Sequence, residues 1–146
     1  MSCYPTKIEL AVDGSTEAKL AARHAVELGS MTGSELHVVH VGLLSHWVHP
    51  DTLSAQQYQR LKDDAQQRLE DEVREIEAAG GKVAKAHLRM GRVDSEVIRV
   101  AEEIGSNLII VGNRGIGALT RILLGVDAES IVRHAPCPVL VVREAS

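Results

Sequence analysis

The sequence of 146 residues has few aromatic side chains, with one tryptophan, two tyrosines and no phenylalanine. So few rings argue against a protein that stacks bases or sugars on aromatic platforms. Hydrophobic residues nevertheless make up 45% of the chain. Length and apolar content together predict one domain, residues 1–146, whose core consists of Val, Ile, Leu and Ala.

Cysteine and long apolar runs are scarce as well. Cys3 and Cys137 lie far apart and form no C-x-x-C pair, which indicates reduced thiols rather than a disulfide framework. We expect Cys137, between two prolines, to be buried and unreactive. No apolar run approaches the roughly 20 residues that span a bilayer, and the N-terminal segment lacks the pattern of a signal peptide. We therefore expect a cytoplasmic protein with no membrane partner.

The charge balance is mildly acidic, with a formal net charge of −4. Proteins that bind nucleic acid broadly usually carry a basic face. We therefore expect no nucleic-acid partner.

Short aliphatic runs alternate with longer amphipathic ones along the whole chain, which is typical of βαβ units and a parallel sheet. Ser15 can cap the first helix, and Gly33 and Gly105 can end the first and third helices. The run 108–111 shows no alternation, as expected for a central strand buried on both faces. The expected strands are 7–12, 35–41, 82–88, 107–111 and 139–143, and the expected helices are 15–31, 54–79, 93–104 and 127–134.

The fourth predicted strand leads into a glycine-spaced segment, Gly112 to Gly125. Glycine lets a phosphate approach the backbone closely, and the helix that starts after Gly125 adds free N–H groups and a dipole that favours an anion. Arg114 can add a charge-assisted contact. Neither G-x-x-x-x-G-K-[ST] nor G-x-G-x-x-G is present. On physical grounds alone the segment is either a phosphate site or a surface loop whose glycines only serve turns.

The spacing Gly112-x2-Gly115-x9-Gly125, between the strand 108–111 and the segment 133–142, resembles the universal stress protein signature. Asp13-Gly14-Ser15 after the first strand is similar to the opening of that family. The resemblance covers nearly the whole chain. It implies a Rossmann-like α/β fold, in which one open five-stranded parallel sheet has the order 3-2-1-4-5 and carries helices on both faces.

The resemblance also implies a function. One branch of the family binds ATP, so it implies a dimeric sensor or regulator, not an enzyme, that binds ATP or a related adenine nucleotide with Mg²⁺. It implies a homodimer through strand 139–143 and a protein partner that the sequence does not identify. Carried over by position, the resemblance implies that Asp13 meets adenine or ribose and that the backbone lines the base and sugar at Ala11, Val41 and Val111. It implies that the phosphates are held by three glycines, Gly112, Gly115 and Gly125, and by the backbone N–H groups of Val126 and Asp127.

The sequence departs from the family pattern just after the third glycine. The family usually has Ser or Thr there, whose hydroxyl bonds phosphate, and this chain has Val126. Asp127 either caps the last helix or helps to hold a metal on the phosphates. The alternative function is therefore a member of the same fold that no longer binds nucleotide and acts only through protein contacts. A nucleotide-using ligase or hydrolase is less well supported, because Asp13-Gly14-Ser15 does not supply the Ser-Gly-Gly loop of such relatives.

The histidines are interpreted as structural or exposed, and no catalytic residue or dedicated metal ligand is assigned. His37 and His40 are three apart on a strand and so face opposite sides, which prevents joint chelation. His46 and His49, near Asp51, form a possible metal site in a loop or are simply exposed. His134 near a helix C-terminus is favoured by the dipole.

Overall fold

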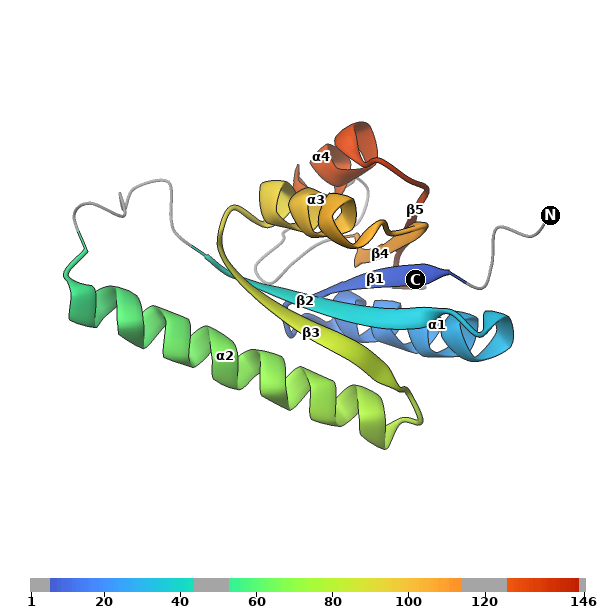
Figure 1. Ribbon diagram of the computed structural model, residues 1–146, viewed down its shortest axis with the longest axis horizontal. Helices are drawn as coiled ribbons and strands as arrows, with labels where there is room; N and C mark the ends of the chain where they lie inside the picture. The colour runs from blue at the N-terminus through green and yellow to red at the C-terminus, as the bar shows by residue number, and fades with distance from the viewer. Residues whose placement is uncertain (1–5, 44–52, 114–125, 145–146) are drawn as a thin grey trace.

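The computed structural model describes residues 6–43, 53–113 and 126–144 of the chain. Strands and helices alternate throughout these residues, as the apolar pattern predicts (Figure 1). The elements are β1 (Lys7–Val12), α1 (Thr16–Thr32), β2 (Glu35–Leu43), α2 (Ala55–Ala78), β3 (Val83–Gly91), α3 (Val93–Ile104), β4 (Leu108–Gly112), α4 (Val126–His134) and β5 (Val139–Val142).

The strands form one parallel sheet in the order β3-β2-β1-β4-β5. This confirms the predicted order 3-2-1-4-5 and the Rossmann-like α/β class. The chain builds outward from β1 to β3 and then returns to the other side of β1 with β4, so the order reverses between β1 and β4. In such sheets, ligands bind beyond the carboxyl ends of the strands at this switch point.

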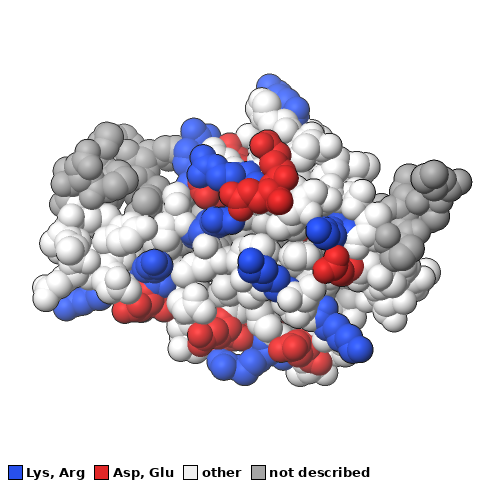
Figure 2. All heavy atoms as spheres, in the orientation of Figure 1, with Lys and Arg blue, Asp and Glu red and all other residues white. Residues whose placement is uncertain are grey.

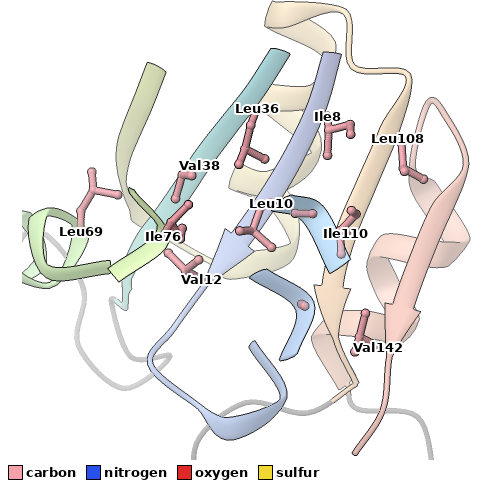
Figure 3. Packing of buried hydrophobic residues seen from close by; sticks show 12 residues of the cluster. Ile8, Leu10, Val12, Leu36, Val38, Leu69, Ile76, Leu108, Ile110 and Val142 are labelled. Atoms are coloured by element: carbon pink, nitrogen blue, oxygen red, sulfur yellow. The ribbon is translucent and has the colours of Figure 1, made fainter. Parts of the chain in front are cut away.

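The helices cover both faces of the sheet, with α1 and α2 on one side and α3 and α4 on the other (Figure 1). Alternate residues of each strand therefore enter different cores. Ile8, Leu10 and Val12 of β1 pack toward α1 and α2, where they meet Leu69 and Ile76 (Figure 3). The second core lies between the sheet and α3 and α4. Both cores are aliphatic, as the lack of aromatic residues predicts.

Local signals place the helix ends. The Ser15 hydroxyl accepts a hydrogen bond from the Ala18 N–H at 3.1 Å, which confirms Ser15 as the N-cap of α1. Gly33 and Gly105 end α1 and α3 with φ angles of 69° and 70°, in the left-handed region that glycine tolerates best. Ser54 caps α2 through a reciprocal pair of bonds with Gln57.

The predicted bounds of four strands are wrong, those of β2 and β3 by the most. β2 continues through Leu43 rather than ending at residue 41, and β3 continues through Gly91 rather than ending at residue 88. The two extensions pair with each other, Gly42 with Met90 and Leu43 with Gly91. Tertiary pairing rather than local sequence therefore sets these ends. β4 starts and ends one residue later than predicted, and β5 ends one residue earlier.

The surface carries charges of both signs. On the face drawn in Figure 2, acidic and basic side chains of the described residues lie interspersed rather than gathered by sign. Among the described residues, no helix is both long and apolar enough to cross a bilayer.

Candidate functional site

A cavity of about 610 Å³ lies where β1, β2 and β4 end. These strands flank the point where the strand order reverses, as expected for a ligand site in an open parallel sheet. The start of α1, residues of α2, α3 and α4, and Met90 of β3 contribute the remaining walls. A volume of this size falls within the range of about 300–1,000 Å³ that is typical of small-molecule sites.

The structure brings together most of the residues that the sequence assigned to the nucleotide. The cavity is lined by Ala11, Asp13, Val41, Val111, Gly112, Val126 and Asp127. Arg114, Gly115 and Gly125 lie outside the described residues, as do His46 and His49. The assignment of the ten residues to nucleotide binding stays a prediction, and the seven described ones converge from four separate segments.

Asp13 is held in place by the turn that leads into α1. Its Oδ1 accepts a hydrogen bond from the Ser15 N–H at 2.9 Å, an Asx turn that the short carboxylate side chain favours. Gly14 between them has φ of 79°, which explains why glycine occupies that position. The turn leaves the carboxylate in the cavity wall beside the first turn of α1.

Gly112 is required by packing, whatever it does for a ligand. A Cβ built on Gly112 would lie 2.9 Å from the backbone N of Ala18 and 2.9 Å from the carbonyl carbon of Glu17. Both atoms belong to the backbone of α1, so neither can move aside easily. The absence of a side chain at Gly112 therefore lets the end of β4 approach α1 closely.

Sequence reasoning missed two polar residues in the cavity wall. His40 Nδ1 donates to the Val12 carbonyl oxygen at 3.0 Å, since a carbonyl can only accept. Asn113 is 1% exposed, and neither polar atom of its side chain has a hydrogen-bond partner among the described residues. The only signal for Asn113 was its place directly after a buried strand, beside the predicted Gly112.

The α2 wall of the cavity was also missed. Leu61, Asp64, Ala65 and Arg68 of α2 line it, whereas no residue of this helix was assigned to the site from the sequence. Arg68 is the one cationic side chain among the described lining residues, against the carboxylates of Asp13, Asp64 and Asp127.

Helix α4 begins at Val126, one residue earlier than predicted. Asp127 therefore lies in the first turn of the helix, and the interpretation of Asp127 as its N-cap is wrong. A carboxylate in this turn is still favourable, because the positive end of the helix dipole lies there. Val126 is 85% exposed at the point where the family pattern has a hydroxyl.

A hydrogen bond ties α4 to α3. Ser130 Oγ donates to Asp94 Oδ2 at 2.7 Å. Burial alone would raise the pKa of Asp94, but hydrogen bonds from Ser130 and Ser95 and the guanidinium of Arg92 outweigh it, so the pKa is lowered. Asp94 is thus a buried anion that fixes the position of α4 beside the cavity.

The remaining histidines have structural contacts. His37 Nδ1 lies 3.1 Å from His87 Nε2, and their rings stack at a centroid distance of 5.4 Å. His37 and His40 thus have different partners, as their predicted opposite faces imply. His134 Nδ1 lies 3.0 Å from the Ser130 carbonyl oxygen at the C-terminal end of α4. Among the described residues, no cluster of three or more His, Cys, Asp or Glu side chains is placed to hold a metal ion.

A second group of buried titratable residues lies on the α3 face of the sheet, outside the cavity. Glu9 of β1 is fully buried, and both carboxylate oxygens lack a hydrogen-bond partner among the described residues. Burial raises the pKa of Glu9 to about 8, although the positive charge of Arg89 opposes the shift. His37 pairs with Glu9 in strand register. Burial also raises the pKa of Cys137, which is half-buried rather than buried as predicted.

Comparison with known proteins agrees with the geometry. The model of the universal stress protein family matches residues 6–143. A putative universal stress protein of Staphylococcus aureus is 36% identical over 137 residues, which cover 93% of this chain and 82% of the relative. A solved universal stress family protein from Burkholderia pseudomallei is 27% identical with a TM-score of 0.71, and 99% of each chain is covered.

Two further solved structures share the fold. One is a universal stress protein in complex with cAMP, 22% identical with a TM-score of 0.73, covering 99% of this chain and 100% of the other. The other is the universal stress protein of Archaeoglobus fulgidus in complex with dAMP, 20% identical with a TM-score of 0.61, covering 97% of this chain and 100% of the other. With the family model matching almost the whole chain, this chain belongs to the universal stress protein family.

Proposed function

We propose that this chain is a cytoplasmic sensor or regulator, not an enzyme, that binds ATP or a related adenine nucleotide. The observation that carries the proposal is the cavity at the ends of β1, β2 and β4, which is lined by the seven described residues that the sequence assigned to the nucleotide. Binding would change the surface that the protein offers to a partner, as a ligand shifts a conformational equilibrium.

The residues in the cavity suit the parts of an adenine nucleotide. Ala11, Val41 and Val111 supply an aliphatic wall for a base and sugar, and Asp13 supplies an acceptor for a hydroxyl or amino group. The first turn of α4 supplies N–H groups and a dipole that favour phosphate. The relatives solved with cAMP and dAMP show that this fold accommodates adenine nucleotides in other members.

Mg²⁺ would bind together with the nucleotide phosphates rather than at a separate site formed by the protein alone. Mg²⁺ usually keeps several waters and binds through one or two carboxylates together with substrate phosphates. Asp13 and Asp127 both line the cavity and have the oxygen ligands that Mg²⁺ prefers. Their carboxylates would hold the metal-bound waters beside the triphosphate.

Thermal unfolding with and without nucleotide tests this proposal. A ligand at about 100 times its dissociation constant stabilises the folded state by about 2.7 kcal/mol. We expect millimolar Mg-ATP to raise the melting temperature, and tripolyphosphate at equal ionic strength to raise it less, since it lacks the base and ribose. No shift with ATP, AMP or cAMP would contradict nucleotide binding.

Val126 provides the prediction that separates nucleotide binding from the alternative, a module that works through protein contacts alone. Val126→Ser restores the hydroxyl of the family pattern on an exposed position, so little stability should change. A hydrogen bond to a charged acceptor contributes about 1.5–3 kcal/mol, so we expect ATP to bind roughly tenfold tighter or more. Titration calorimetry of both proteins measures this ratio. ATP binding by the serine variant alone would mean that the natural site has lost its ligand.

We also propose a homodimer through β5. This strand is the outermost on its side of the described sheet, and an apolar edge strand is usually paired or covered. Val141→Lys places a charge on that edge, so we expect sedimentation equilibrium to show a monomer in place of the wild-type dimer. Val132→Lys, on an exposed position of α4, should leave the dimer intact. A Val141→Lys protein with the wild-type mass would exclude this interface.

A further inference from the structure

The side chain of Asn113 stands out among the cavity residues because it is buried without a partner. The residue directly follows β4 and is 1% exposed. Its backbone N–H donates to the Val142 carbonyl oxygen at 2.8 Å, which fixes the main chain. The side-chain Nδ2 and Oδ1 have no hydrogen-bond partner among the described residues. Native proteins pair the great majority of buried polar atoms, because leaving one unpaired is costly.

The surroundings of Asn113 indicate what the missing partner is. Asn113 lines the cavity together with Val126, Asp127 and Ala128 of α4. These residues form the first turn of a helix of nine residues, and the N–H groups of a first turn have no acceptor within their own helix. The positive end of the helix dipole favours a negatively charged group at the same place. An anionic acceptor in the cavity would suit both the amide of Asn113 and the N–H groups of this first turn.

Among the described residues, the other buried polar atoms without a hydrogen-bond partner do not belong to residues that line the cavity. The hydroxyl of Ser106 is buried and unpaired, but Ser106 precedes β4 at the opposite end of the strand and does not line the cavity. Among the described residues with an unpaired buried polar side-chain atom, Asn113 is the one that belongs to the cavity lining, together with the first turn of α4.

We propose that Asn113 Nδ2 donates a hydrogen bond to a phosphate oxygen of the bound nucleotide. This inference rests on the proposed function and deepens it by naming a side chain, in addition to backbone groups, that recognises the phosphate. The ligand-free protein is then less stable because this amide is unpaired, and phosphate binding removes that penalty.

The Asn113→Ala variant tests the proposal through two measurements, the affinity for ligands and the melting temperature of the ligand-free protein. The loss of a hydrogen bond to a charged acceptor should weaken binding of ATP and AMP on the order of 10- to 100-fold. Adenosine, which has no phosphate, should bind the variant and the wild type equally. The melting temperature of the ligand-free variant should be unchanged or higher, because an unpaired buried amide is removed. A residue with only a structural role would lower it.

Two further variants make the result decisive. Ser106→Ala also removes an unpaired buried polar group, so it should leave the melting temperature unchanged or higher and leave ATP affinity unchanged. Asn113→Asp keeps the shape of the side chain but repels phosphate, so it should weaken ATP binding more than alanine does.

Three results would overturn the inference. The first is ATP affinity that is unchanged in Asn113→Ala, the second is an equal loss for adenosine, and the third is Asn113→Asp binding ATP as well as the alanine variant. A wild-type protein that binds none of the three ligands would instead refute the proposed function, and the inference with it.

Discussion

Replacing Glu9 by glutamine is expected to stabilise the protein by about 3 kcal/mol at pH 7 and about 5 kcal/mol at pH 9. The pKa of Glu9 is raised from 4.5 to about 8 by burial in the centre of the sheet. Between these two pH values the folded state holds a proton that the unfolded state has released. The stability contributed by the neutral carboxyl is therefore complete below pH 4.5 and is lost as the pH rises through 8. Glutamine imitates the neutral form at every pH.

The groups around Glu9 set the conditions of this measurement. His37 of β2 pairs with Glu9 in strand register and contacts His87 of β3. Glu9 interacts electrostatically with Arg89 of β3 and with Cys137 before β5. Aliphatic residues of α3 cover this face of the sheet, and Glu103 of α3 pairs with Arg89. Burial lowers the pKa of both histidines below 6.5. The stability that the neutral histidines contribute is therefore lost only as the pH falls. Burial also raises the pKa of Cys137, which both proteins contain. The difference between wild type and Glu9→Gln in denaturant unfolding at pH 7 and pH 9 therefore reports on Glu9.

A matched control for Glu9→Gln is Glu102→Gln, which replaces an exposed carboxylate on α3. Surface substitutions of this kind usually change stability by less than about 0.5 kcal/mol, so we expect no difference between the two pH values. A Glu9→Gln protein that is less stable than the wild type at pH 9 would show that the buried carboxylate has a partner that compensates for its burial.

Gly112→Ala is expected to destabilise the protein by about 1–3 kcal/mol, the usual cost of forcing extra atoms into a close-packed site. The added methyl group would lie 2.9 Å from two backbone atoms of α1. The first turn of α1 must then move, and Asp13 and Ser15 move with it. We therefore expect weaker ATP binding as well as a lower midpoint of denaturant unfolding.

Gly29→Ala serves as a control for which we expect the opposite change in stability. Gly29 lies within α1, and a Cβ there would make only an ordinary contact, 3.7 Å from the Ser34 carbonyl oxygen. Alanine in a helix interior is favoured over glycine by about 1 kcal/mol, so this variant should be more stable than the wild type. If Gly112→Ala matched the stability of Gly29→Ala, close packing of β4 on α1 would not explain the glycine.

Much of the fold was predictable because it depends on local signals. Alternating aliphatic and amphipathic segments gave every described strand and helix, and Ser15, Gly33 and Gly105 gave the caps. The lengths of β2 and β3 were not predictable, since they depend on the pairing of Leu43 with Gly91. Residues far apart in sequence decide that register.

The candidate site was predictable only where a family motif marks it. Asp13, Val41 and Gly112, which the family resemblance assigned to the nucleotide, line the cavity, whereas Asn113 and the α2 wall were missed. Whether a buried amide has a partner depends on the packing of several elements, which one sequence does not reveal. Glu9 was missed for a similar reason. Between Ile8 and Leu10 it has the alternation of a solvent-facing strand position, and yet it is fully buried.

Titration calorimetry of the wild-type protein with Mg-ATP tests the central claim most directly, namely that the cavity at the ends of β1, β2 and β4 binds an adenine nucleotide. The account predicts saturable heat with one nucleotide per chain, and a weaker or absent signal when GTP replaces ATP. No heat at millimolar ATP, AMP or cAMP would contradict it and would leave a universal stress protein that acts through protein contacts alone.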